Sequence, residues 1–230
     1  MNAQDWIIQI VIAFAIGSLP FGVLIARAHG VNLRDVGSGN TGATNVGRAL
    51  GRGWGIACFL LDAAKGAAPV VWAGLAGGTI GRSLAEQTSG SEWAWVLVGL
   101  AAVLGHIYSP FLRFKGGKGV ATAFGAFAAM WPIMSIPVGA ALVVFIVTKV
   151  ASGYMSLASI LAAWSMAIAV LVMSVSGGTG LWAETTLPPL LVAAVIAALV
   201  TWRHRSNLAR IRAGTEPKKG SRTADPGQPG

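Results

Sequence analysis

The chain has little of what soluble and secreted proteins rely on. It contains one cysteine, Cys58, in 230 residues, so an intrachain disulfide is excluded. Charged residues make up only 11% of the sequence, whereas soluble domains carry roughly 25%. Hydrophobic residues instead reach 54%. This composition excludes an ordinary soluble domain and indicates an integral membrane protein.

Apolar runs recur along the chain, and most are long enough to cross a bilayer, which takes about 20 residues. We predict an all-α, polytopic membrane helix bundle with about seven transmembrane helices, at residues 6–27, 54–77, 93–112, 119–132, 135–151, 154–176 and 187–202. The fourth and fifth runs are short and meet at Trp131-Pro132, so hydropathy alone also allows one long helix there. Six spans would place the termini on the same side of the membrane, and seven would place them on opposite sides.

The basic residues favour seven spans. With seven, one side of the membrane receives all 17 Lys and Arg residues except Arg82, which lies opposite, and Lys65, which lies within a span. Short loops rich in Lys and Arg remain in the cytoplasm. We therefore expect the N-terminus outside, the C-terminus inside and the glycine-rich loops in the cytoplasm.

The two ends of the chain are interpreted from their composition. No Lys or Arg precedes the first apolar run, which is longer than a typical signal-peptide core, so we interpret it as an uncleaved span. Residues 1–213 then form one transmembrane domain. Residues 214–230 are rich in Pro, Gly, Lys and Ser and are predicted to be a disordered basic cytoplasmic tail. Since the basic residues are divided among several loops, no nucleic-acid binding is expected.

Three polar clusters lie on the predicted cytoplasmic side, at residues 37–45, 113–120 and 203–207. Glycine lets backbone N–H groups approach an anion closely, and Lys and Arg add positive charge. The first cluster matches a dinucleotide-binding pattern, but an apolar span rather than a strand precedes it. The second has Gly119 where a P-loop requires Ser or Thr. What remains is general anion binding by backbone amides and cations.

These three clusters and the residues around them form three sequence motifs. The first motif is Gly37-Ser38-Gly39-Asn40-x-Gly42-x-Thr44-Asn45-x-x-Arg48. The second is Gly116-Gly117-Lys118-Gly119-Val120-Ala121-Thr122, preceded by His106 and Phe111. The third is Arg203-His204-x-x-Asn207, followed by Arg210 and Gly214-x-Glu216. Their order and content resemble the motifs of the bacterial acyl-phosphate:glycerol-3-phosphate acyltransferases, and the similarity extends to about Glu216.

This resemblance implies a seven-span enzyme of the bacterial inner membrane with its active site on the cytoplasmic face. The implied reaction moves a fatty acyl group from acyl phosphate to the 1-hydroxyl of glycerol 3-phosphate, giving lysophosphatidate and phosphate. Catalytic roles are implied for His204, Asn207 and Ser38, and a supporting role for Glu216. The residues implied in binding substrate phosphate are Arg48, Lys118, Gly116, Gly117, Gly119, Asn40 and Asn45.

The implied chemistry needs no covalent intermediate, because acyl phosphate is a mixed anhydride with a good leaving group. The glycerol hydroxyl can attack directly once both groups are oriented. His204 is the candidate base, since an unperturbed histidine titrates near pH 6.5. The alternative is that the departing phosphate takes the proton while His204 only hydrogen-bonds the acceptor. The sequence leaves both open.

Several absences narrow the class further. None of the three histidines is followed by Asp five residues later, so the His-x-x-x-x-Asp chemistry of acyltransferases that use acyl-CoA or acyl-carrier protein is not supported. The predicted cytoplasmic side carries only Asp35, Glu216 and Asp225 as carboxylates, so we expect no metal site. We also expect no cofactor and no obligatory protein partner beyond the two substrates and membrane lipid.

Two questions stay open at this point. Asp62 and Lys65 lie three residues apart within a predicted span, and a structural ion pair is favoured over a contact with substrate. The rival function is a transporter or channel for a phosphorylated solute. It would need binding residues near the midplane and on both faces, whereas the predicted outer loops are poor in cations. The acyl-chain preference and the oligomeric state are not indicated.

Overall fold

The computed structural model describes residues 1–83, 86–176 and 184–218, and all regular structure within them is helical, as predicted. The α-helices are α1 (Ala3–Gly17), α2 (Phe21–Ala28), α3 (Ala43–Leu50), α4 (Arg52–Gly77), α5 (Ser89–Ile107), α6 (Val120–Ala128), α7 (Ser135–Ser152), α8 (Met155–Ser176), α9 (Leu187–Arg203) and α10 (Arg205–Arg212). A short 3-10 helix lies at Pro110–Leu112.

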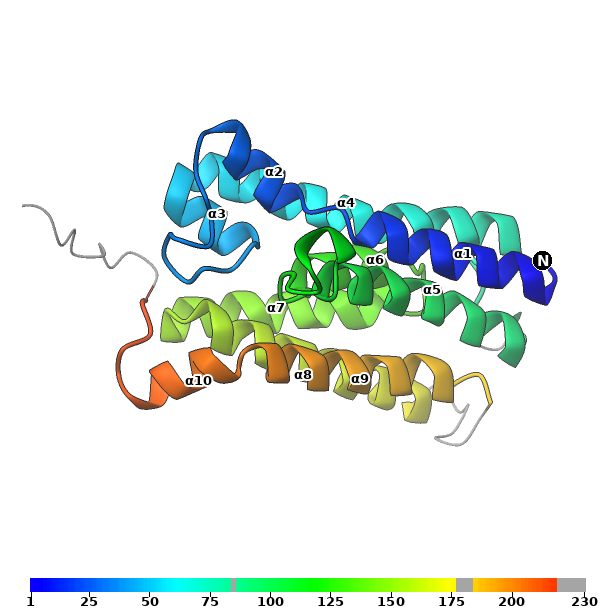
Figure 1. Cartoon of the computed structure of the whole chain (residues 1–230). Helices are drawn as coiled ribbons and strands as arrows, with labels where there is room; N and C mark the ends of the chain where they lie inside the picture. Colours follow the sequence, from blue (N-terminus) through cyan, green and yellow to red (C-terminus); the bar gives the residue numbers. More distant parts are fainter. Residues whose placement is uncertain (84–85, 177–183, 219–230) are drawn as a thin grey trace, which may run out of the picture.

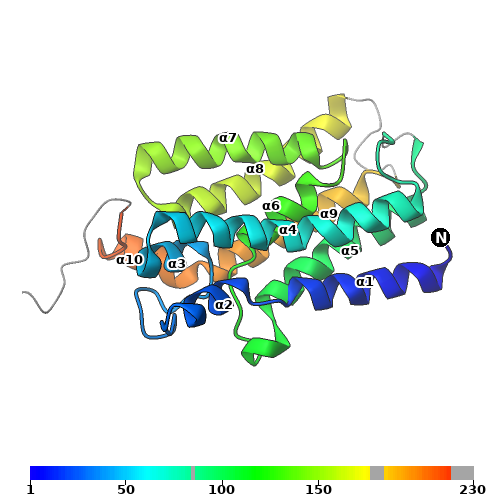
Figure 2. The same cartoon turned by 90° about the horizontal axis from the view of Figure 1, so that it is seen from above.

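The long helices run alongside one another in one elongated bundle (Figures 1 and 2). The N-terminus lies at one end of the bundle and α10 at the other, and both views agree on this. Among the described residues, five helical segments are long and apolar enough to cross a membrane, and a sixth candidate is α9 together with α10, bent by 54° between them. The predicted membrane helix bundle is confirmed. Its exact number of spans stays a prediction.

The first predicted span, 6–27, is interrupted. Helix α1 ends at Gly17, and α2 begins only at Phe21. Pro20 explains the interruption, because proline has no backbone N–H and disfavours helical geometry in the residue before it. The break brings α2 and the loop after it, residues 33–42, to the end of the bundle opposite the N-terminus (Figure 1).

The fourth predicted span, 119–132, is shorter than expected. Helix α6 has nine residues, which at 1.5 Å each give about 14 Å, roughly half of the hydrocarbon core. The amide of Gly81 donates to the carbonyl oxygen of Trp131 over 2.9 Å, so the α6–α7 turn lies at the same end of the bundle as the α4–α5 connection. The stretch therefore forms two helices joined by a turn, and not the single long helix that hydropathy also allowed.

Small residues let α6 sit deep in the bundle against α4. A Cβ atom at Gly66 would overlap the carbonyl oxygen of Thr122, and one at Gly125 would overlap that of Ala63. Backbones that approach this closely are typical of helix packing in membranes, where dispersion contacts replace the hydrophobic effect. The outer surface is apolar by contrast, with Trp72 65% exposed, as expected for a surface that faces lipid.

Helix α4 carries the predicted ion pair in its buried part. Lys65 Nζ lies 2.7 Å from Asp62 Oδ1, and both side chains are buried. The two residues therefore form an ion pair, and its structural role stays a prediction.

Candidate active site

The first motif forms a loop, residues 33–42, that is held in shape by Asn45 of α3. The Asn45 Oδ1 atom accepts from the backbone N–H of Ser38 over 3.0 Å and from its hydroxyl over 3.3 Å. Its Nδ2 atom donates to the carbonyl oxygens of Leu33 and Val36. Asn40 similarly accepts from the amide of Gly42 over 3.0 Å. The two asparagines therefore organise the loop. Ser38 is exposed on it, and Arg48 is exposed on the neighbouring helix α3.

The second motif forms the glycine loop, residues 116–119, which packs against the end of α5. A Cβ atom at Gly116 would overlap the carbonyl oxygen of His106, and one at Gly117 would overlap the His106 imidazole. Gly119 has φ +82° and starts α6, a left-handed conformation that favours glycine. Close packing against His106 thus explains why positions 116 and 117 are glycines, and the sequence did not reveal this packing.

The third motif lies at the bend between α9 and α10. One guanidinium nitrogen of Arg203 donates to the carbonyl oxygens of Gly116 and Gly117, over 2.9 and 3.0 Å, and so ties the glycine loop to this bend. His204 is buried at the bend, and its Nδ1 atom lies 2.7 Å from the carbonyl oxygen of Val200. Because a carbonyl only accepts, Nδ1 carries the proton in the neutral ring, and Nε2 is the basic atom.

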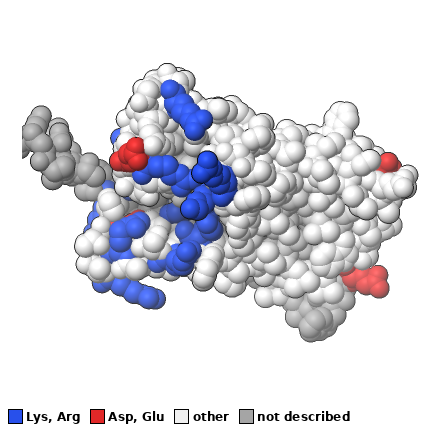
Figure 3. Space-filling model, viewed as in Figure 1, with Lys and Arg blue, Asp and Glu red and all other residues white. Residues whose placement is uncertain are grey.

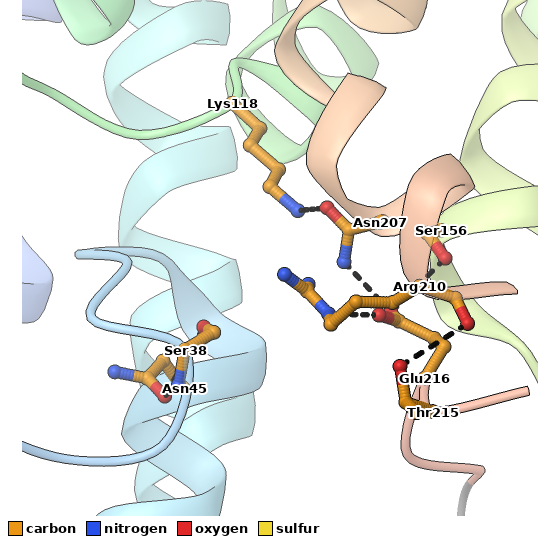
Figure 4. A network of polar contacts seen from close by, with 8 residues as sticks. All are labelled: Ser38, Asn45, Lys118, Ser156, Asn207, Arg210, Thr215 and Glu216. Atoms are coloured by element: carbon orange, nitrogen blue, oxygen red, sulfur yellow. Dashed lines mark hydrogen bonds and ion pairs between the residues drawn. The ribbon is translucent and has the colours of Figure 1, made fainter. Parts of the chain in front are cut away.

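A chain of polar contacts joins the second and third motifs (Figure 4). Lys118 Nζ donates to Asn207 Oδ1 over 2.5 Å, and Asn207 Nδ2 donates to Glu216 Oε1 over 2.7 Å. Glu216 also accepts from Arg210 Nε over 2.8 Å and from the hydroxyl of Ser156 over 3.2 Å. Figure 4 shows Ser38 of the first loop and Asn45 of α3 on the side facing this network.

Burial and neighbouring cations shape the electrostatics of the site. Burial lowers the pKa of Lys118 to about 8, against a partly compensating effect of Glu216, and Arg210, Arg48 and Arg203 lower it further. Burial, followed by the charge of Lys118, lowers the pKa of His204 to about 4. His204 is therefore neutral at pH 7.

Glu216 lies within this network through its contacts with Asn207, Arg210 and Ser156, and its supporting role stays a prediction. Burial alone would raise the pKa of Glu216, but hydrogen bonds from Asn207 and Arg210 outweigh burial and hold it below the usual value. Glu216 thus contacts the site residues, although the predicted tail began at 214. The rest of that tail, residues 219–230, lies outside the described residues, and its disorder stays a prediction.

Positive charge dominates this end of the bundle (Figure 3). Lys and Arg side chains gather on the end opposite the N-terminus, and the rest of the visible surface is almost free of them. A group of several cations is suited to bind anions. The amides of Gly116 and Gly117 donate instead to the carbonyl oxygens of Ile107 and His106, so their predicted contacts with phosphate stay a prediction. Within the described residues, no group of three or more His, Cys, Asp or Glu side chains is placed to hold a metal ion.

The structure thus brings together most of the residues singled out from the sequence. Lys118, Asn207 and Glu216 are in contact, and Arg48 and His204 lie within electrostatic reach of Lys118. Sequence reasoning gave no role to Arg203, Arg210, Ser156 and Arg34. Arg34 donates to the carbonyl oxygen of Lys115 over 2.5 Å and so links the first loop to the second. Arg203 and Arg210 belong to the third motif, and their place in it was the only sequence feature that could have indicated a role for them.

Known proteins that resemble this chain in sequence share one function name. The family model described as glycerol-3-phosphate acyltransferase matches residues 7–214. Proteins named glycerol-3-phosphate acyltransferase from Geotalea daltonii and Thermus thermophilus are 43% and 40% identical, over 91% and 96% of this chain and 95% and 98% of theirs. Nothing in these relatives supports the transporter interpretation.

Solved structures agree with the sequence relatives. The crystal structure of PlsY, an integral membrane glycerol 3-phosphate acyltransferase, in its glycerol 3-phosphate form superimposes with a TM-score of 0.78 at 38% identity, over 94% of this chain and 96% of that one. Its lysophosphatidic acid form gives a TM-score of 0.75 at 37% identity, over 93% and 95%. With the family model covering nearly the whole chain, the protein belongs to the glycerol-3-phosphate acyltransferase family.

Proposed function

We propose that the protein transfers a fatty acyl group from acyl phosphate to the 1-hydroxyl of glycerol 3-phosphate, giving lysophosphatidate and phosphate. The observation that carries this proposal is the group of cations around Lys118, which includes Arg48, Arg203 and Arg210 and faces the buried carboxylate of Glu216. Both substrates carry phosphate. A site with a surplus of positive charge at the polar end of a membrane bundle suits two anions, one of them attached to a lipid chain.

In the proposed reaction, the hydroxyl oxygen of glycerol 3-phosphate attacks the carbonyl carbon of acyl phosphate. The new ester C–O bond forms as the C–O bond to phosphate breaks, and the hydroxyl proton passes to Nε2 of His204. Lys118, Arg48 and Ser38 hold and orient the phosphates, and orientation of this kind can supply ~7–11 kcal/mol of the barrier. Asn207 positions the Lys118 ammonium through its 2.5 Å contact, and Glu216 fixes Asn207.

The choice of donor tests this function. Purified protein with glycerol 3-phosphate is expected to form lysophosphatidate from acyl phosphate, and only background product from acyl-CoA or acyl-carrier protein. The physical reason is that a thioester has no phosphate on its reacting carbon for these cations to hold. Product formation is measured with radiolabelled glycerol 3-phosphate. Comparable turnover with acyl-CoA would contradict the proposed donor.

We further propose that the site faces the cytoplasm of a bacterial inner membrane, with the N-terminus outside and the C-terminus inside. The basic residues at the α10 end support this orientation. A membrane-impermeant thiol reagent added to intact cells is expected to label Gly90→Cys and not Ser206→Cys. Both positions are exposed, and a Cβ at Gly90 meets open space.

The wild type is the matched control for labelling, because its one cysteine, Cys58, is buried. Ser206→Cys should become reactive once the membrane is permeabilised. Labelling of Ser206→Cys in intact cells would reverse the proposed orientation.

A further inference from the structure

The proposed reaction makes no use of a cluster of three charged or titratable side chains deep in the bundle. This buried cluster consists of Asp62 and Lys65 of α4 and His106 of α5, each at most 8% exposed. Asp62 Oδ1 lies 2.7 Å from Lys65 Nζ and 3.6 Å from His106 Nδ1. Ionisable groups in a membrane protein are costly to bury, and an apolar trio would pack these helices without that cost.

The cluster touches both parts of the chain that lead into the site. Lys65 Nζ donates to the carbonyl oxygen of Leu19 over 2.6 Å, at the break between α1 and α2. The His106 imidazole lies directly against Gly117, where any side chain would overlap its Nε2 atom. Asp62 Oδ1 thus pairs with Lys65, which contacts the entry to the first loop, and lies next to His106, against which the glycine loop packs.

A small cavity of about 10 Å³ marks the same junction. It is lined by Ser18 of the helix break, Thr41 of the first loop and Gly117 of the glycine loop, together with Asp62, Lys65 and His106. The hydroxyl of Ser109 also donates to the carbonyl oxygen of Ser18 over 2.6 Å across this junction. The first loop and the glycine loop meet here over the buried cluster.

The glycine loop is therefore held from two sides. Arg203 binds the carbonyl oxygens of Gly116 and Gly117 from the bend after α9. On the other side, the amide of Gly116 donates to the carbonyl of Ile107 and that of Gly117 to the carbonyl of His106. Lys118 follows directly, so a shift of His106 moves the ammonium that the proposed function places on substrate phosphate.

We propose that Asp62, Lys65 and His106 are positioning residues that fix the glycine loop, and with it Lys118, at the distance from the first loop that binding of substrate phosphate requires. This inference rests on the proposed function. It predicts coupling: neutralising Asp62 lets His106 and the loop shift, which weakens the same phosphate contact that Lys118 makes.

A double-mutant cycle tests the coupling, with KM for each substrate, kcat and melting temperature measured on purified Asp62→Asn, Lys118→Ala and the double variant. Asp62→Asn is expected to raise the same KM that Lys118→Ala raises, by about fivefold or more. In the double variant the combined rise should fall short of the product of the single effects by at least about threefold, a size typical of residues in one network. Asp62→Glu should recover part of the lost affinity.

Glu92→Gln is the matched control. It replaces an acidic side chain by its amide at a fully buried position in the first turn of α5, far along the helix from His106. Its KM values should stay within about twofold of wild type, because no contact joins it to the glycine loop. If Asp62→Asn does not fold, His106→Gln replaces it in the double-mutant cycle with Lys118→Ala.

The outcomes separate this inference from the proposed function. Fully multiplicative effects, or a lower melting temperature with unchanged KM values, would reduce the cluster to a structural role and overturn the inference. If Lys118→Ala leaves both KM values unchanged, the proposed phosphate contact of Lys118 fails. A raised KM in Asp62→Asn would then still support a role of the cluster in positioning the loop. An unchanged KM in Asp62→Asn would overturn that role.

Discussion

Replacing His204 with alanine is expected to lower kcat by ~10²–10⁴-fold and to change KM far less, the effect of losing a general base. The His204 ring is buried at the α9–α10 bend, and its Nδ1 proton is held by Val200, which leaves Nε2 as the basic atom. With a pKa of about 4, the ring is neutral at pH 7 and able to accept a proton. Two bound phosphate anions would raise that pKa and strengthen the base during the reaction.

Steady-state kinetics on purified His204→Ala, with both substrates varied, measure this effect. His29→Ala is the matched control, because His29 is an exposed residue after α2 and should keep wild-type kinetics. A near-normal kcat with a raised KM in His204→Ala would show instead that the departing phosphate takes the proton and that His204 only orients the acceptor.

The pH dependence of wild-type activity is a second test of the proposed role of His204. The profile of kcat/KM reports groups of the free enzyme, so the acidic limb due to His204 should lie near pH 4, where the imidazole gains its proton. An unperturbed histidine would place that limb near pH 6.5. The downward shift follows from burial and from the charge of Lys118, neither of which the sequence reveals.

Hydropathy was sufficient to predict the helices, because a segment in lipid must satisfy its backbone hydrogen bonds internally and a helix does so. It could not predict where helices stop inside an apolar run. Residues 119–132 are apolar almost throughout, yet α6 ends at Ala128, and Pro20 breaks the first run where hydropathy continues. An apolar segment indicates that the chain lies in the membrane or in the protein interior. The point at which its helix ends depends instead on local backbone chemistry.

The motifs named most residues of the site but not how they are connected. Arg203 reaches Gly116 across 87 positions of sequence, and Lys118 reaches Asn207 across 89. Contacts of this kind depend on how the helices pack, and no local pattern encodes them. Asn45 illustrates the same limit. The family resemblance implied phosphate binding for it, whereas its side-chain amide is occupied by hydrogen bonds to the loop that carries Ser38. Its predicted contact with phosphate stays a prediction.

Replacing Lys118 with alanine is expected to raise KM for the substrate whose phosphate it holds by roughly 10–150-fold, the equivalent of losing one charge-assisted hydrogen bond of ~1.5–3 kcal/mol. The decrease in kcat should be smaller if the contact is equally strong in the ground state and the transition state. Lys115→Ala is the control, because Lys115 lies three positions earlier with its side chain exposed. A change confined to kcat would assign Lys118 to the reacting centre instead of to binding.

The lowered pKa of Lys118 makes this role visible in the wild type as a dependence on pH. The ammonium must be protonated to hold phosphate, and burial lowers its pKa from 10.5 to about 8. The charge is therefore present below pH 8 and is lost as the pH rises through that value, so KM should rise on the alkaline side. Lys118→Arg keeps its charge there, since a guanidinium has a pKa above about 12. Its KM should be higher than that of wild type at neutral pH, because a guanidinium does not fit the Asn207 contact equally well, but it should stay flat to about pH 9.5. An alkaline rise that persists unchanged in Lys118→Arg would assign the titration to another group and remove Lys118 from the phosphate site.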